Sequence, residues 1–258
     1  MKKYLLAAAG LAALVSWSSV AQDIRMGTEG GYLPWNYVDS SGQLQGYDID
    51  VMKEVQNRTD LNVQWEIIDF DALIPNLLAG RFDAVMSGMT ANDERRQSID
   101  FTTPYAEIPN VFAAKENFGE ITDLAGLKAA LKGKTIGALA STTHATYIET
   151  ELGSDVELRT YRTSNEVYND LEAGRIDAAF AEETAINIYL EEHPDAFIIF
   201  GPKLTGADSK LFGDGMGIGV SKENPELTQK INEALESMRQ DGTLSELATQ
   251  HFGFDASK

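Results

Sequence analysis

The alternation of apolar and polar positions predicts strands and helices in turn along most of the chain. Apolar runs of strand length are expected at residues 24–27, 63–68 and 83–87, and helical periodicity is expected at 48–58 and 71–78. Strands that alternate with helices usually form parallel sheets with helices packed on their faces. This order therefore indicates an α/β fold with largely parallel sheets.

One segment of the chain recurs. Residues 77–84 read LLAGRFDA, and residues 171–178 read LEAGRIDA. In both copies a helix ends at a glycine, where a left-handed backbone is needed, and an apolar strand follows. A strand at 135–139 and a helix at 143–152 are expected before the second copy, in the same order as before the first. We therefore predict two related α/β lobes.

The segment after the second lobe is expected to return to the first. It contains a Gly-rich apolar strand at 213–220 and one or two amphipathic helices within 224–252. Two chain crossings form a hinge, and closure around a ligand is the expected motion. The predicted domains are a signal peptide, the first part of lobe 1, lobe 2, and the return to lobe 1 with its C-terminal helices: residues 1–21, 22–108, 109–203 and 204–258.

The first residues have the features of a secretory signal. Lys2 and Lys3 precede an apolar run over 4–15, and Ser19 and Ala21 are the small residues of a cleavage site. The run is short for a bilayer-spanning helix, so a membrane anchor is the weaker interpretation. No cysteine follows to carry a lipid anchor. We expect the mature protein to be free in the periplasm.

Composition narrows the range of partners and reactions. The formal net charge of −19 argues against nucleic acid or an anionic membrane as partner. The chain has no cysteine, and its three histidines, His144, His193 and His251, show no metal-ligand spacing. It has no G-x-S-x-G motif, and its Gly-rich segment at 27–31 lacks the lysine of a phosphate-binding loop. We expect no catalytic residues, no metal and no cofactor.

Open α/β sheets bind ligands beyond the carboxyl ends of their strands. Applied to both lobes, this rule selects the following residues: Glu29, Gly30, Gly31, Tyr32, Trp35, Phe70, Ser87, Gly88, Thr90, Ser141, Thr142, Thr143, His144, Glu182 and Glu183. Taken singly, the aromatic residues would more often belong to the core, and Glu182 could equally be a surface acid.

Several of these residues suit the charged groups of an amino acid. Residues 90–93 resemble a capped helix start, and Arg95 follows one turn later, an arrangement suited to a carboxylate. A capped surface helix with a solvated arginine is the alternative. Glu182 could accept from an ammonium group. Tyr32 and Phe70 could stack on a flat or cationic side chain, and Glu29 could pair with the charge of that side chain.

Short sequence motifs also occur along nearly the whole chain after the predicted signal peptide. They are GTEGGYLPW at 27–35, GYDID at 46–50, FDALIP at 70–75, DAVMSGMT at 83–90, DERR at 93–96, LKGKTIG at 131–137, FGDG at 212–215 and QDGT at 240–243. Together they resemble the polar amino-acid-binding proteins of ABC importers, solute-binding protein family 3, and most closely the lysine/arginine/ornithine- and arginine-binding members. The resemblance implies a type II periplasmic-binding-protein fold, with two α/β lobes joined by a two-stranded hinge.

The resemblance also implies roles for single residues. Arg95 matches the clamp for the ligand α-carboxylate, helped by Thr90 and by Thr142 from the other lobe, and Leu139 and Thr143 lie in the matching lining segment. The α-ammonium and side-chain groups are expected to contact the remaining residues: Glu182, Ser87, Gly88, Tyr32, Phe70 and Glu29.

These roles imply a monomeric, non-enzymatic protein that binds a cationic L-amino acid and delivers it to an inner-membrane ABC permease. Arginine is expected first, then lysine, ornithine or histidine. Glu182 is longer than the family's usual aspartate, which keeps an opine or another polar amino acid open. A periplasmic enzyme on this fold, similar to cyclohexadienyl dehydratase, is a further alternative. A detached chemoreceptor sensor domain is less favoured, because no spanning segment follows Lys258.

Overall fold

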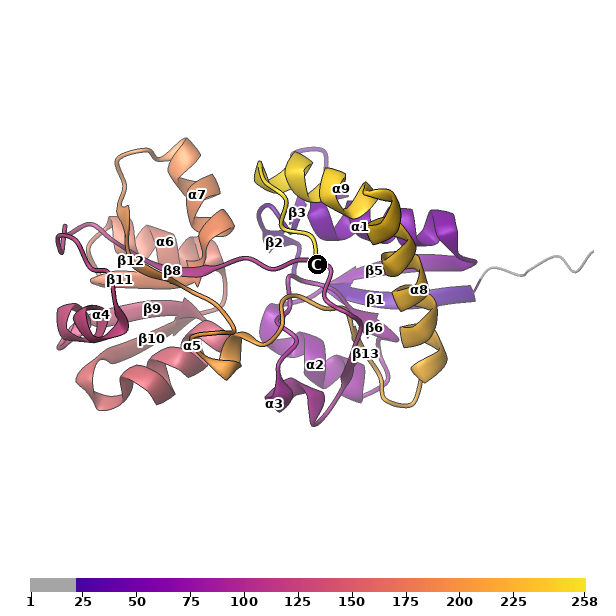
Figure 1. The fold of residues 1–258 in the computed structure, drawn as a ribbon, viewed down its shortest axis with the longest axis horizontal. Coiled ribbons are helices and arrows are strands. Elements are labelled where there is room, and N and C mark those ends of the chain that lie inside the picture. The colour runs from indigo at the N-terminus through magenta and orange to yellow at the C-terminus, as the bar shows by residue number, and fades with distance from the viewer. Residues whose placement is uncertain (1–21) are drawn as a thin grey trace, which may run out of the picture.

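The computed structural model describes residues 22–258, and the predicted signal peptide lies outside the described residues. Two lobes lie side by side, each built around one five-stranded sheet (Figure 1). In spatial order, the first sheet contains β5 (Leu61–Ile67), β1 (Gln22–Thr28), β6 (Ala84–Val85), β13 (Gly219–Val220) and β7 (Asp100–Phe101). The second contains β10 (Glu157–Tyr161), β9 (Thr135–Leu139), β11 (Ala178–Glu182), β8 (Asn110–Ala114) and β12 (Ile198–Leu204).

The two sheets have the same strand directions. The first three strands of each are parallel, and the fourth, β13 or β8, is antiparallel to both of its neighbours. Each of these antiparallel strands follows a passage of the chain between the lobes (Figure 1). The two-lobed, largely parallel α/β architecture is therefore confirmed. The exact boundaries at 108/109 and 203/204 stay a prediction.

Helices cover both sheets. Lobe 1 carries α1 (Tyr47–Arg58), α2 (Phe70–Leu78), α3 (Asp93–Arg96), α8 (Pro225–Asp241) and α9 (Thr243–Phe252). Lobe 2 carries α4 (Leu124–Leu131), α5 (Thr143–Tyr147), α6 (Ser164–Glu172) and α7 (Glu183–Glu192). A π-helical turn (Ile148–Leu152) and a 3₁₀ turn (Gly153–Asp155) continue α5, and another 3₁₀ turn spans Lys210–Phe212. The short strands β2 (Gly31–Tyr32), β3 (Asn36–Val38) and β4 (Leu44–Gln45) form a separate sheet before α1.

The repeated segments fold alike. Gly80 and Gly174 both have a φ of +69°, the left-handed conformation that ends a helix readily at glycine. Asp83 and Asp177 then each accept a 2.8 Å hydrogen bond from a backbone N–H in the corresponding strand of their own sheet, β1 and β9 respectively. The two similar segments therefore join helix to strand in the same way in both lobes, in agreement with two related units.

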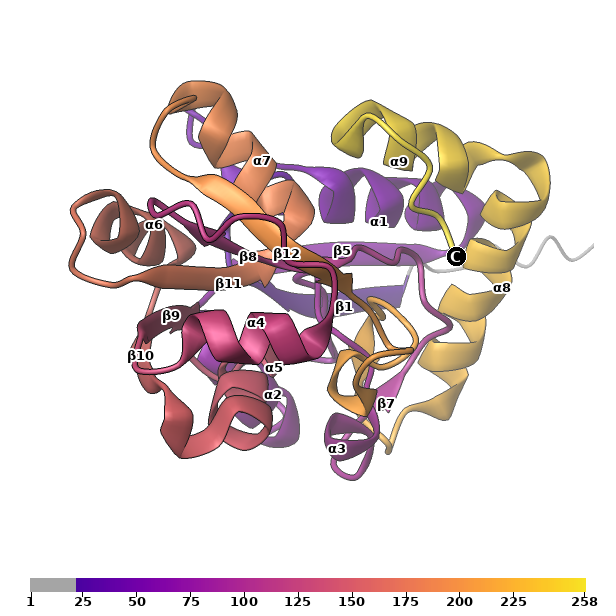
Figure 2. The same ribbon diagram turned by 60° about the vertical axis from the view of Figure 1, so that its left-hand side comes forward.

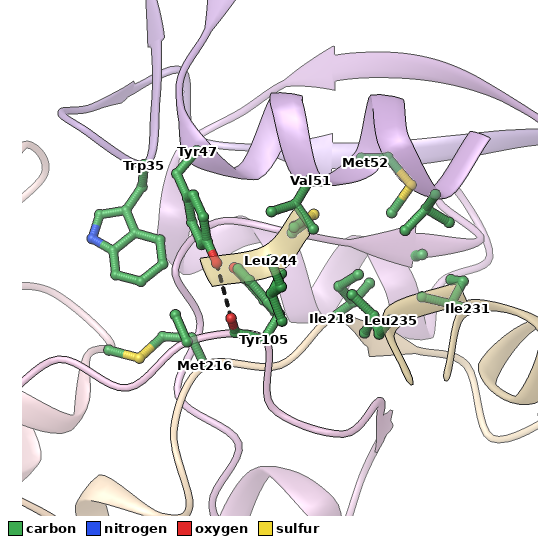
Figure 3. Close-up of a cluster of buried hydrophobic side chains, with 14 of the residues drawn as sticks. Trp35, Tyr47, Val51, Met52, Tyr105, Met216, Ile218, Ile231, Leu235 and Leu244 are labelled. Atoms are coloured by element: carbon green, nitrogen blue, oxygen red, sulfur yellow. Dashed lines mark hydrogen bonds between the residues drawn. The ribbon is translucent and has the colours of Figure 1, made fainter. Parts of the chain in front are cut away.

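The chain returns to lobe 1 at its end, where α8 and α9 lie beside α1 (Figures 1 and 2). Their side chains complete a buried cluster in which Leu235 and Leu244 are fully buried together with Tyr47 and Tyr105 (Figure 3). The Tyr47 hydroxyl donates to the backbone C=O of Tyr105 at 2.9 Å. This bond ties α1 to the segment that leads towards lobe 2.

The prediction of a strand over 213–220 is wrong in its extent, because only Gly219–Val220 pairs as a strand. Gly213 and Gly215 have φ of +56° and +124°, and such positive angles interrupt regular strand geometry. Met216 makes isolated bridges instead. Within residues 22–258, no helix is long and apolar enough to cross a bilayer.

Candidate functional site

A cavity lies between the lobes, at the carboxyl ends of strands from both sheets. All but one of the predicted ligand-binding residues line it: Glu29, Tyr32, Phe70, Gly88, Thr90, Arg95, Leu139, Thr142, Thr143 and Glu182. The exception is Ser87, which is fully buried beside the cavity.

The carboxylate of Glu29 follows β1 and has no hydrogen-bond partner. The residue is 9% exposed, and neither oxygen meets a donor among residues 22–258. Burial, and then the charge of Asp69, raises the pKa of Glu29 to about 7. An unpartnered buried carboxylate is unfavourable, because it has lost water without gaining other donors. The site therefore presents unpaired negative charge that a cation would stabilise.

Glu182 supplies a second buried carboxylate from lobe 2. It is the last residue of β11 and is 2% exposed. The Tyr32 hydroxyl of lobe 1 donates to its Oε2 at 2.7 Å. Burial raises the pKa of Glu182 to about 8, and the bond from Tyr32 partly opposes that rise. The two carboxylates thus face one cavity from opposite lobes.

Arg95 provides positive charge from α3. The cap of this helix differs from the expectation, because Asn92 rather than Thr90 accepts from the backbone N–H of Arg95, at 3.0 Å. The guanidinium lies 5.6 Å from the centre of the Phe70 ring and donates to the backbone C=O of Thr90 at 2.9 Å. Burial lowers the pKa of Arg95 to about 10, so the group is charged at neutral pH.

Contacts between the lobes show that they are closed. Arg95 donates to the backbone C=O of Ser141 at 3.1 Å, in addition to the bond from Tyr32 to Glu182. Leu139 of lobe 2 packs into a cluster of lobe 1 side chains. Arg162 and Asp69 form an ion pair across the cleft, where both side chains are largely solvent-accessible. The structure therefore describes the enclosed form of the site.

A buried network fixes the loops of lobe 1 that carry the site. Asp48 is fully buried and accepts from the side chains of Asn36 and Tyr105 and from the backbone N–H of Gly88, at 2.8, 2.6 and 3.0 Å. Asn36 also donates to the hydroxyl of Ser87 at 3.2 Å, and that hydroxyl accepts from the backbone N–H of Glu29 at 3.2 Å. These bonds explain why Ser87 supports the cavity without lining it. Its predicted ligand contact stays a prediction.

Comparison with known proteins gives the family. Residues 24–254 match the model described as bacterial extracellular solute-binding proteins, family 3. The chain belongs to this family.

Several relatives of this family 3 protein are named for the amino acids that they bind. It is 37% identical to the histidine-binding periplasmic protein of Escherichia coli K12, over 94% of this chain and 92% of that protein. It is 36% identical to the lysine/arginine/ornithine-binding periplasmic protein of the same strain, over 99% and 98%. A Salmonella typhimurium periplasmic binding protein described for its high arginine specificity superposes with a TM-score of 0.80 at 29% identity, over 90% of this chain and 100% of that one. The comparisons confirm the predicted family and fold class, and these relatives are named as binding proteins, not enzymes.

Other residues also line the cavity of this family 3 protein. His144 belongs to the strand-end set but had no predicted role, and the others lie outside that set: Ser164, Val167, Tyr168, Phe180 and Ala181. Burial, and then the charge of Arg95, lowers the pKa of His144 to about 3, and its Nε2 lies 2.7 Å from Asn110 Oδ1. His144 is therefore neutral. Across 22–258 no cluster of acidic and histidine side chains could hold a metal ion.

Proposed function

We propose that this protein binds a cationic L-amino acid, arginine foremost and then lysine, ornithine or histidine, between its closed lobes. The single observation that carries this proposal is Glu29, a buried carboxylate in the cavity whose two oxygens lack any donor. A ligand cation would supply those donors. Because both oxygens are free, a guanidinium could make two parallel hydrogen bonds, whereas an ammonium acts as a point charge.

A bound cation would favour the ionised forms of both acids, and the charges of the site then support a ligand with a net charge of +1. The cavity is lined by two carboxylates, Glu29 and Glu182, and one guanidinium, Arg95. Arg95 would hold the ligand carboxylate, with help from Thr90 and Thr142. Glu182 would hold the α-ammonium group, which leaves the charge of Glu29 for the ligand side chain. A zwitterionic neutral amino acid would leave Glu29 unpaired, at a cost of up to about 3 kcal/mol for its ionised form.

The surrounding side chains suit the rest of such a ligand. Tyr32 and Phe70 are both more than nine-tenths buried and line the cavity, where they could hold an aliphatic or guanidinium chain. The backbone of Gly88 and the lobe 2 residues Leu139 and Thr143 close the remaining walls.

The proposed role is transport rather than catalysis. Lobe closure would bury the ligand, and the closed form would dock on an inner-membrane ABC permease. We propose that the protein acts as a monomer in the periplasm after export by residues 1–21. The relatives' names and family membership support this role.

Titration calorimetry with the purified mature protein tests the proposal. Arginine, lysine, ornithine, histidine, glutamine, glutamate and an arginine-derived opine would be compared under one condition. The expected result is tightest binding of arginine, with weaker binding of the other cations. Tight binding of glutamine or glutamate without arginine binding would refute the cationic ligand. Turnover of prephenate would refute the transport role.

A further inference from the structure

Tyr168 of α6 carries a second unpartnered polar group in the cavity. The residue is 3% exposed, and its hydroxyl has no hydrogen-bond partner among residues 22–258. The neighbouring phenol of Tyr189 differs, because it donates to Glu172 at 2.8 Å. A buried hydroxyl without a partner has lost its hydrogen bonds to water and has gained none from the protein in return. Tyr168 lines this cavity and also the adjoining pocket at α7, and a ligand in the cavity could supply the missing partner.

The Tyr168 side chain is held in place by its surroundings. Its ring lies 5.0 Å from that of Tyr189 and 6.1 Å from that of Phe197, measured between centroids. Helix α6 begins with a capping box, in which Thr163 and Glu166 each accept from the backbone N–H of the other. A rigid helix with a packed ring keeps the hydroxyl at one position, as a recognition group requires.

The charges around the hydroxyl indicate which ligand group it would meet. The pKa of the Tyr168 phenol is raised by burial, then by the negative charge of Glu182 and then by that of Glu29. Tyr168 and Tyr32 together line both this cavity and the adjoining pocket at α7, and the Tyr32 hydroxyl binds Glu182, so Tyr168 lies on the Glu182 side of the cavity. A cationic N–H donor placed near Glu182 would meet the oxygen of Tyr168 as an additional acceptor.

We propose that the Tyr168 hydroxyl accepts an N–H from the ligand's α-ammonium group beside Glu182 and thereby determines specificity for a free primary amine. This inference rests on the proposed function. With Glu182, Tyr168 and the predicted contact at Gly88, the ammonium group would meet three acceptors. A primary ammonium has three N–H donors and can satisfy all three, whereas a secondary ammonium has two and leaves one acceptor unsatisfied. The substrate class is therefore an amino acid with an unsubstituted α-amino group, which disfavours the opines.

Calorimetry with Tyr168→Phe tests this proposal, and Tyr189→Phe is the matched control on the adjacent ring. We expect Tyr168→Phe to weaken arginine and lysine equally, by about tenfold, because both ligands carry the same ammonium group and a hydrogen bond to a charged group is lost. Tyr189→Phe keeps wild-type affinity. Nα-methylarginine should bind the wild type more weakly than arginine does, and this difference should shrink in Tyr168→Phe.

Thermal unfolding of the ligand-free variants separates recognition from a structural role. Removing an unpartnered hydroxyl should leave the Tm of Tyr168→Phe unchanged or raised, while removing the satisfied hydroxyl of Tyr189 should lower it. Wild-type affinity in Tyr168→Phe, or a loss confined to arginine, overturns the inference while leaving the proposed function in place. Failure of the wild type to bind any cationic amino acid overturns both.

Discussion

Replacing Glu29 by glutamine keeps the shape of the side chain and removes its charge. In the closed structure the pKa of Glu29 is about 7 against an ordinary 4.5, chiefly through burial. That difference corresponds to at most about 3 kcal/mol against the ionised form. The carboxyl group is protonated in both folded and unfolded chains below pH 4.5, so the penalty is absent there. The destabilisation of the folded protein by ionised Glu29 develops as pH rises above 4.5 and is complete above pH 7.

Glu29→Gln should weaken ligand binding, although it should stabilise the ligand-free protein. A guanidinium paired with Glu29 would satisfy both oxygens, and loss of one partner of a buried charge pair costs roughly 2–5 kcal/mol. We therefore expect Glu29→Gln to raise the Kd for arginine by about 30-fold to several thousandfold at 25 °C. At pH 8 the empty variant should unfold at a higher temperature than the wild type, and at pH 4 this difference should disappear.

Calorimetry and thermal unfolding measured on the same preparations check both parts. Glu66→Gln is the matched control, because Glu66 is an exposed acid on β5 of the same lobe. Wild-type arginine affinity in Glu29→Gln would refute the assignment of Glu29. A fall in Tm at pH 8 would show that this carboxylate has a partner that stabilises the empty protein.

Three further variants test other parts of the site and fold. Arg95→Ala should weaken every amino-acid ligand by at least about a hundredfold in calorimetry, because it removes the proposed carboxylate clamp, whereas Arg96→Ala should not. Gly46→Ala should lower the free energy of unfolding in urea by more than about 2 kcal/mol, because Gly46 has a φ of 120° and an added Cβ would lie 2.3 Å from a backbone oxygen; Gly42→Ala, with open space around it, should cost less. Arg162→Ala should change the Kd by less than about fivefold, because its ion pair is exposed; a larger change would make that pair a latch.

The sequence predicted most of the lobe architecture because its information is local. The repeated helix–glycine–strand segment needs only a left-handed glycine and an apolar strand, and both copies fold that way. The strand at 213–220 was overestimated for a related reason. Its apolar content indicated a strand, but Gly213 and Gly215 take positive φ angles that composition alone does not reveal.

The strand-end rule selected residues that line the cavity, whereas Tyr168, in the middle of α6, was not selected. The ends of parallel strands meet at one edge, so Glu29 and Glu182 could be placed there without coordinates. Tyr168 reaches the cavity from α6 through the packing of that helix on lobe 2, and its apolar surroundings resemble an ordinary core pattern. Ser87 was selected from a strand end but does not line the cavity. The direction of its hydroxyl depends on Asn36, which is distant in sequence.

The central claim is that Glu29 recognises the positive charge of the ligand side chain. Comparing arginine with citrulline tests it most directly, because the two share their shape and α-groups and differ in the charge of the terminal group. We predict that the wild type binds arginine at least about a hundredfold more tightly than citrulline at pH 7.5, and that Glu29→Gln largely removes this preference. Equal affinity of the wild type for the two ligands would contradict the account.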